Sequence, residues 1–506
     1  MKTGTGTASL PAKLAALLLI LCLLPCAALG DGEAPRAELT DNLVETKHSI
    51  EIGGKQIDYT ATTGTMALES DLGQYEIFFT AYTVDSVDDP AQRPITFAFN
   101  GGPGSASLWL HMGLLGPEKI ALNEEGKIEK IPVGTKPNEY CILDMTDLVF
   151  IDPVGTGYSR ALPGTNEKTF FSYEKDIRSV GDFIRLYTSR YGRWASPKYV
   201  AGESYGTTRA IGLCDYLRSK HNLALNGIML VSSINDFASI ETTAGNELPY
   251  VNYLPSFAAA AWYHKKAAEE YLAMELEDYL EEVKAYAAGD YLSLLYQGSR
   301  ISAEEKEAAA EKIAAYIGVS KEFVLKHNLR VKLDDFNPEL LSDRKLMIGR
   351  TDSRYTGPVV EGNLDDGTSD PSSLGITEAF SGVFNQYVSQ VLNYHTDQPY
   401  TVLSIDVNDA WSFDSDNRAL AQEDTIRDCM SANEQMKIWV LCGRYDLATP
   451  FFAAEWVYSH LFLNDELQAN LSFTYYPSGH MFYLHEPSMA QFRKDAEAWY
   501  GHPSTR

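Results

Sequence analysis

The stretch that most constrains this chain is Gly202-Glu203-Ser204-Tyr205-Gly206, which has the pattern G-x-S-x-G. A short apolar run at 199–201 precedes it, and residues 207–218 have the composition of a helix. A strand, a sharp turn and a helix form the context in which this pattern makes a nucleophile elbow. Side chains at 202 and 206 would crowd the neighbouring strand and helix, so glycine is required at both positions. We therefore predict that Ser204 is held above a sheet at the start of a helix.

The motif alone also fits an ordinary turn, so the rest of the chain has to separate the two interpretations. Two apolar runs, 94–99 and 147–152, each end in a glycine-rich loop. Apolar residues at helical spacing follow at 174–191, and 226–234 has the composition of another core strand. Apolar strands alternating with helices are typical of a mostly parallel α/β sheet, whose active site lies beyond the carboxyl ends of the strands.

Changes of pattern divide the 506 residues into four segments. Residues 1–30 have the charged, apolar and small-residue regions of a cleaved signal peptide. Residues 31–240 should form the first part of the α/β core, beginning with antiparallel hairpins at 47–82. Residues 241–400 interrupt the alternation with helical, aromatic-rich patterns, so we expect a mainly helical lid inserted there. Residues 401–506 return to apolar strands and complete the core.

The apolar run of the leader, 14–24, is about half the ~20 residues that a bilayer span needs, which favours cleavage over an uncleaved anchor. We expect a secreted or periplasmic protein with no membrane attachment after cleavage. The 45% hydrophobic content is ample for a large core. The formal net charge of −27 argues against binding to nucleic acid and to anionic membranes. The oligomeric state cannot be inferred from the sequence.

Four cysteines remain after the leader is removed, and none has metal-ligand spacing, so we expect no metal and no other cofactor. Export permits disulfides, but the surroundings of these cysteines are those of small buried hydrophobic residues. Cys429 with Cys442 is the one pairing that merits a check.

A serine hydroxyl becomes a good nucleophile only with a base, a group that orients the base, and donors for the oxyanion. Two late apolar runs end in glycine-bearing loops that carry Asp446 and His480. The order Ser204, Asp446, His480 is that of the α/β-hydrolases. Alternative histidines are His111, in a predicted helix, and His485, in the stretch after His480. We predict a triad of Ser204, His480 and Asp446.

Two backbone N–H groups should form the oxyanion hole. One is expected from Tyr205, directly after the nucleophile, and the other from Gly102 in the loop after 94–99. A phosphate-binding loop is the alternative for that glycine-rich stretch, but the Lys-Ser/Thr step that completes it is missing.

Five motifs together resemble the serine carboxypeptidase family in order along the chain: NGGPGS at 100–105, DPVGTGYS at 152–159, GESYG at 202–206, GRYDLATP at 443–450 and SGHM at 478–481. The resemblance covers the core on both sides of the predicted lid. It implies an α/β-hydrolase fold and the release of single residues from peptides with a free C-terminus.

By the same resemblance, Asn100, Gly101 and Glu203 would hold the terminal carboxylate of the substrate, and Met481 would line the pocket of the leaving residue. A glutamate buried beside an anion should have a raised pKa, which would favour activity at acidic pH. The family roles of Ser204 and the rest of its triad agree with those assigned from the pattern.

Three positions depart from the family pattern. An apolar Leu114 stands where the family usually has a second glutamate for carboxylate binding. Ser105 replaces a cysteine that is common in the family. Asp152 directly precedes Pro153, which makes this motif one residue shorter than its common form. We therefore expect a milder acid preference than a site with two glutamates would show. Four arginines could replace this glutamate in binding the carboxylate: Arg209, Arg350, Arg354 and Arg444. Surface salt bridges are the simpler interpretation of all four.

Three functions remain to be compared. The first is an exported serine carboxypeptidase, and the second is an esterase or acyltransferase on the same triad, which Leu114 would suit through an uncharged leaving group. The third is a silent binding protein on a hydrolase fold, against which the intact triad argues.

Overall fold

The computed structural model describes residues 38–359, 370–416 and 418–501. The predicted signal peptide, 1–30, lies outside these ranges and stays a prediction. Within the described ranges, we find no helix with the length and apolarity needed to cross a membrane.

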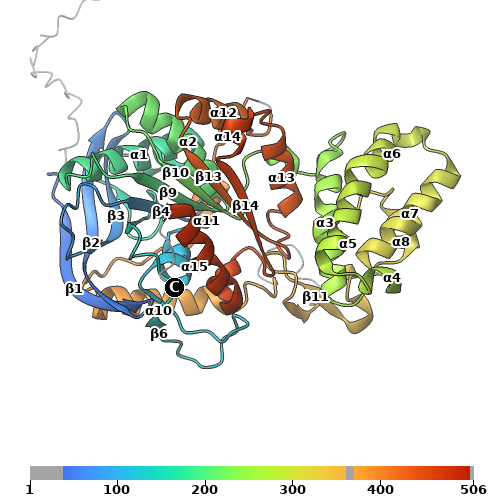
Figure 1. Cartoon of the computed structure of the whole chain (residues 1–506), viewed down its shortest axis with the longest axis horizontal. Helices are drawn as coiled ribbons and strands as arrows, with labels where there is room; N and C mark the ends of the chain where they lie inside the picture. Colours follow the sequence, from blue (N-terminus) through green and yellow to red (C-terminus); the bar gives the residue numbers. More distant parts are fainter. Residues whose placement is uncertain (1–37, 360–369, 417, 502–506) are drawn as a thin grey trace, which may run out of the picture. The chain divides into compact units, whose positions relative to one another are not determined.

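One large sheet organises the described residues (Figure 1). Its order is β1-β2-β3-β7-β4-β9-β10-β13-β14, and β8 pairs with β3. β1 to β3 form antiparallel hairpins, whereas β7, β4, β9, β10, β13 and β14 are parallel. The strands are β1 (Asn42–Ile52), β2 (Lys55–Ser70), β3 (Gly73–Val84), β4 (Ile95–Phe99), β7 (Asp147–Ile151), β8 (Arg160–Ala161), β9 (Lys198–Glu203), β10 (Gly227–Val231), β13 (Lys437–Gly443) and β14 (Leu471–Tyr476). The predicted hairpins and the mostly parallel α/β sheet are confirmed.

Helices cover both faces of this sheet, because alternate residues of each parallel strand point to opposite sides. The main helices of the core are α1 (Tyr173–Arg190), α2 (Tyr205–His221), α10 (Ile376–Gln390), α12 (Glu423–Ala432), α13 (Phe451–Ser459) and α15 (Glu486–Tyr500). Shorter ones are η1 (Leu110–Leu115), η2 (Glu167–Phe170), η3 (Phe237–Ser239), α11 (Ile405–Asp409), α14 (Asp465–Gln468) and η7 (Phe482–Leu484).

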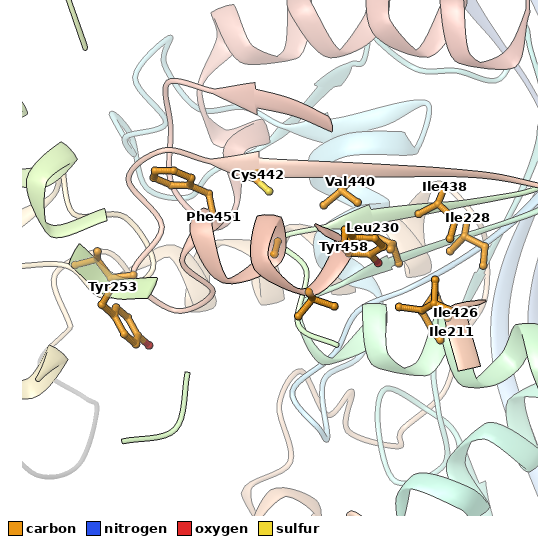
Figure 2. Packing of buried hydrophobic residues seen from close by; sticks show 14 of the residues in the cluster. Ile211, Ile228, Leu230, Tyr253, Ile426, Ile438, Val440, Cys442, Phe451 and Tyr458 are labelled. Atoms are coloured by element: carbon orange, nitrogen blue, oxygen red, sulfur yellow. The ribbon is translucent and has the colours of Figure 1, made fainter. Parts of the chain in front are cut away.

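Figure 2 shows one side of this packing. Ile228 and Leu230 of β10 and Ile438 and Val440 of β13 belong to one buried cluster with residues of α2, α12 and α13 (Ile211, Ile426 and Tyr458). The intervening strand residues, such as Met229 and Trp439, belong to a second cluster with α10 and α15. The core is thus two apolar layers divided by the sheet.

A largely helical block follows β10 in the sequence, and its use as a lid stays a prediction. It holds α3 (Leu248–Tyr263), α4 (Glu269–Leu272), α5 (Leu276–Tyr286), η4 (Ala287–Tyr291), α6 (Leu292–Gln297), η5 (Gly298–Arg300), α7 (Ala303–Ile317), α8 (Lys321–Lys326), α9 (Leu333–Glu339) and η6 (Ser342–Arg344). A capping box is present at Ser302, where α7 begins. Helix α3 packs against α13 of the core (Figure 1). Two small antiparallel pairs, β5 (Glu118–Ile120) with β6 (Thr135–Pro137) and β11 (Leu346–Ile348) with β12 (Thr356–Pro358), stand apart from the large sheet.

Helix α10 lies in the predicted lid segment but packs on the core. Phe380 lies 4.8 Å from the Trp109 ring, and the Tyr387 hydroxyl is 2.9 Å from that of Tyr82 on β3. The predicted boundary between lid and core at residue 400 stays a prediction. The contacts of α10 show that the C-terminal part of the predicted lid segment is anchored on the core.

All four cysteines of the described residues are buried and free: Cys141, Cys214, Cys429 and Cys442. This confirms their expected use as small buried hydrophobic residues, and the pairing of Cys429 with Cys442 is not formed.

Candidate active site

Ser204 occupies the sharp turn between β9 and α2, with φ 59° and ψ −129°. A non-glycine residue is strained in this region, and such strain is concentrated at functional sites. A Cβ at Gly202 would lie 2.1 Å from the Gly206 carbonyl oxygen, and one at Gly206 would lie 2.9 Å from the Phe99 carbonyl oxygen. The predicted need for glycine at both positions is confirmed. The turn leaves Ser204 partly exposed between buried neighbours.

Asp446 and His480 follow the neighbouring parallel strands β13 and β14. The His480 Nδ1 lies 2.7 Å from Asp446 Oδ2, and both residues are buried. A proton on Nδ1 makes this bond to the carboxylate, which leaves Nε2 as the free acceptor of the neutral ring. Burial disfavours the charged ring, but the charge and hydrogen bond of Asp446 raise the pKa of His480 above its ordinary value.

The Asp446 carboxylate is itself held by the loop that leads into α13. Its Oδ1 accepts from the backbone N–H groups of Ala448 at 2.7 Å and Thr449 at 3.0 Å, and Oδ2 accepts from the Thr449 hydroxyl at 2.7 Å. These bonds fix the carboxylate plane that faces His480. Thr449 was not predicted from the sequence, although an aspartate that accepts from backbone N–H groups two and three residues later is a recognisable Asx turn.

The end of β10 joins the serine and histidine loops. The Ser204 N–H donates to the Val231 carbonyl at 3.0 Å, and the next hydroxyl, Ser232, donates to the His480 carbonyl at 2.7 Å. The His480 N–H donates to the Thr351 carbonyl at 2.6 Å. Neither Ser232 nor Thr351 was predicted from the sequence. Thr351 lies in an irregular segment between two small strands, where no periodicity gives a signal.

The glycine-rich loop after β4 lies directly against the elbow. A Cβ at Gly101 would lie 2.5 Å from the Tyr205 backbone nitrogen, so the two segments touch there. Gly102 has φ +101°, which favours glycine. Tyr205 is the first residue of α2, where backbone N–H groups have no partner inside the helix. The two predicted oxyanion donors therefore lie on adjoining segments.

Glu203 is buried immediately before the nucleophile. Burial raises its pKa to about 7, although the charge of His480 and hydrogen bonds from Tyr483 and Asn100 favour the ionised form. The Tyr483 hydroxyl lies 2.9 Å and 3.2 Å from the two carboxyl oxygens of Glu203. Tyr483 was not among the predicted site residues.

Of the other predicted substrate-binding residues, Asn100 hydrogen-bonds this carboxyl group. Asn100 is buried, and its Oδ1 accepts from the Leu110 N–H at 3.0 Å, where η1 begins. Met481 follows His480 and is partly buried. Leu114 is fully buried within η1, so it offers no polar group to a ligand.

The alternative histidines have other surroundings. His111 Nε2 lies 2.6 Å from the Tyr82 hydroxyl, and burial lowers the pKa of its ring to about 3. His485 Nδ1 lies 2.8 Å from the Ser488 hydroxyl. Their hydrogen bonds therefore belong to the packing of η1 and α15.

Three of the four arginines considered as carboxylate binders are engaged with carboxylates of the chain. Arg209 binds Asp176 at 2.7 Å, Arg354 binds Asp352 at 2.7 Å, and Arg444 binds Glu277. The expectation of a surface salt bridge is wrong for Arg209, because α1 and the glycine-rich loop bury both members of its pair. Arg350 is exposed.

The profile of the serine carboxypeptidase family matches residues 54–481. The chain belongs to this family. Within the serine carboxypeptidases, the curated relative "Serine carboxypeptidase-like 13" of Arabidopsis thaliana is 26% identical over 185 residues, which cover 35% of this chain and 40% of that protein. "Carboxypeptidase Y homolog A" of Sclerotinia sclerotiorum is 28% identical over 156 residues, covering 30% of this chain and 26% of that protein. These alignments thus span less than half of each relative.

A solved carboxypeptidase structure shares the fold. The structure of Kex1(delta)p, a prohormone-processing carboxypeptidase from Saccharomyces cerevisiae, aligns over 88% of this chain and 91% of its own length. The TM-score is 0.57 at 16% sequence identity. The predicted α/β-hydrolase fold is confirmed.

Proposed function

We propose that the chain is an exported serine carboxypeptidase that releases C-terminal residues from peptides through an acyl-enzyme on Ser204. The observation that carries the proposal is Glu203, a buried carboxyl group with a pKa of about 7 directly before the nucleophile. At mildly acidic pH this group is protonated and can donate a hydrogen bond to a carboxylate without bringing two negative charges together.

In the proposed acylation step, Ser204 Oγ attacks the carbonyl carbon of the last peptide bond while His480 Nε2 accepts the hydroxyl proton. The Asp446 carboxylate holds the Nδ1–H and stabilises the positive ring that forms. The N–H groups of Gly102 and Tyr205 bind the oxyanion. His480 then gives its proton to the leaving amino group, and the C–N bond breaks.

Deacylation repeats these steps with water. His480 Nε2 takes a proton from a water molecule that attacks the acyl carbon, and it returns that proton to Ser204 as the ester bond breaks. In the substrate complex, Asn100, the Gly101 amide and protonated Glu203 hold the terminal carboxylate. Met481 lines the pocket of the released residue, and the block at 241–400 serves as a lid over the peptide.

The test compares an N-blocked dipeptide acid with its C-terminal amide and ester between about pH 4 and 8. We expect a higher kcat/KM for the free acid below pH 7, no turnover by Ser204→Ala, and labelling of Ser204 by an organophosphonate. Equal or better turnover of ester and amide at every pH would contradict carboxypeptidase activity.

An esterase or acyltransferase on the same triad is the second candidate, and one observation favours it. Leu114, at the position where the family usually has a second glutamate, is apolar and fully buried, so this position does not supply a second carboxyl group. In the same experiment, preference for the ester with intact Ser204 labelling would select this candidate.

A further inference from the structure

A tyrosine that follows the histidine loop contacts the carboxyl group before the nucleophile. Tyr483 lies in η7 and is 4% exposed, and its hydroxyl lies 2.9 Å from Oε2 and 3.2 Å from Oε1 of Glu203. We propose that Tyr483 is a positioning residue for recognition of the substrate's terminal carboxylate, acting by fixing the orientation of the Glu203 carboxyl group. This inference rests on the proposed carboxypeptidase function.

The packing beside Tyr483 is built to admit its ring. A Cβ at Gly113 would lie 2.4 Å from Cε2 and 2.6 Å from Cδ2 of Tyr483, so any larger residue at 113 would displace the ring. Gly113 lies in the π-helix η1, and such helices are frequent at functional sites. The first N–H of the same helix, that of Leu110, is bound by Asn100. Helix η1 therefore supports both side chains that face Glu203.

The Tyr483 hydroxyl determines which carboxyl oxygen of Glu203 can donate a hydrogen bond to a ligand. A phenol has one proton, and burial together with the Glu203 charge raises the pKa of Tyr483 well above its ordinary value, so it stays a donor. When Glu203 is protonated, the oxygen that accepts from Tyr483 is the carbonyl oxygen. The proton then lies on the other oxygen, which is free to donate to a carboxylate.

The charges around Glu203 explain why one neutral donor matters here. His480 favours the ionised carboxyl group and Asp446 opposes it, while Asn100 and Tyr483 donate to it. Removing the Tyr483 hydroxyl takes away a bond that stabilises the carboxylate, so the pKa of Glu203 should rise. Because the protonated form binds the terminal carboxylate, activity on a free acid should then persist to higher pH even as its maximum falls.

Tyr483→Phe tests this directly, since it keeps the ring against Gly113 and removes only the hydroxyl. For the peptide acid we expect kcat/KM to fall about tenfold, mainly through KM, and the alkaline limb to move up by about one pH unit. For the matching ester we expect a change within about twofold. Tyr387→Phe is the matched control, because it removes a buried hydroxyl that bonds Tyr82 and not Glu203, and it should leave the acid-to-ester ratio unchanged.

Gly113→Ala provides a second variant that keeps Tyr483 but displaces its ring, and it should give the same selective loss on the acid. Equal losses of kcat/KM on acid and ester in both variants, or an unmoved alkaline limb in Tyr483→Phe, would overturn the proposed role of Tyr483. Neither result would contradict the proposed carboxypeptidase function. A wild-type enzyme that does not prefer the free acid would overturn the proposed function and this inference with it.

Discussion

Replacement of Glu203 by glutamine gives the sharpest test of carboxylate recognition by a protonated carboxyl group. The carboxamide has nearly the shape of the protonated acid, and its carbonyl can accept from Tyr483 while its N–H group donates to a ligand. Glu203 has a pKa of about 7, so protonation is nearly complete at pH 6 and falls to about one molecule in eleven at pH 8. The ratio of the wild-type kcat/KM on a peptide acid to that on its ester should therefore fall about tenfold between these two pH values, because loss of the His480 proton acts equally on both substrates.

Glu203→Gln should abolish that loss, because glutamine remains a donor at every pH. The assay is a pH series of kcat/KM for an N-blocked dipeptide acid and its ester, with both proteins at constant ionic strength. The ester reports the titration of His480, whose raised pKa makes activity rise with pH as the ring loses its proton. A variant whose acid activity still falls above pH 7 while its ester activity does not would refute the reasoning, and so would a wild-type ester profile that falls in parallel.

Other predictions concern groups that orient or support the site. Asp446→Asn should lower kcat by about 10⁴-fold with little change in folding, because the amide favours the wrong tautomer of His480; kinetics and circular dichroism would show both. Arg209→Met should lower the free energy of unfolding by about 3–5 kcal/mol in urea titrations, since it leaves Asp176 buried without its partner. Gly202→Ala should abolish organophosphonate labelling of the nucleophile, because its Cβ would lie 2.1 Å from a carbonyl oxygen across the turn.

The parts of the molecule that the sequence predicted are those governed by local pattern and strand order. The elbow around Ser204 has its own steric signature, and the buried runs predicted the parallel strands. Since the carboxyl ends of neighbouring parallel strands meet at one edge, the loops of Asp446 and His480 could be expected to approach each other. The segment around Thr351 could not be predicted, because its carbonyl reaches the histidine loop only through the tertiary packing of an irregular chain.

The partner of the Glu203 carboxyl group could not be predicted from the residue at position 114. In the sequence, Leu114 indicates only that a carboxyl group is missing beside Glu203. In the structure, the neighbouring residue Gly113 makes room for Tyr483, which follows Glu203 by 280 residues and donates to the same carboxyl oxygens. A buried carboxyl group needs a partner of suitable chemistry, and that partner can come from any segment that packs there.

This difference changes how the carboxylate site should titrate. Two adjacent carboxyl groups share a proton and titrate in two coupled steps, one of them shifted far from its ordinary range. A single carboxyl group with a phenol partner titrates once, because Tyr483 keeps its proton throughout. The alkaline limb on peptide acids should therefore fit the loss of one proton with a midpoint near the Glu203 pKa of about 7. Such a titration would give the milder acid preference that we expect from Leu114. An alkaline limb of the pH–rate profile that fits the loss of two protons, or that falls steeply above about pH 5, would contradict it.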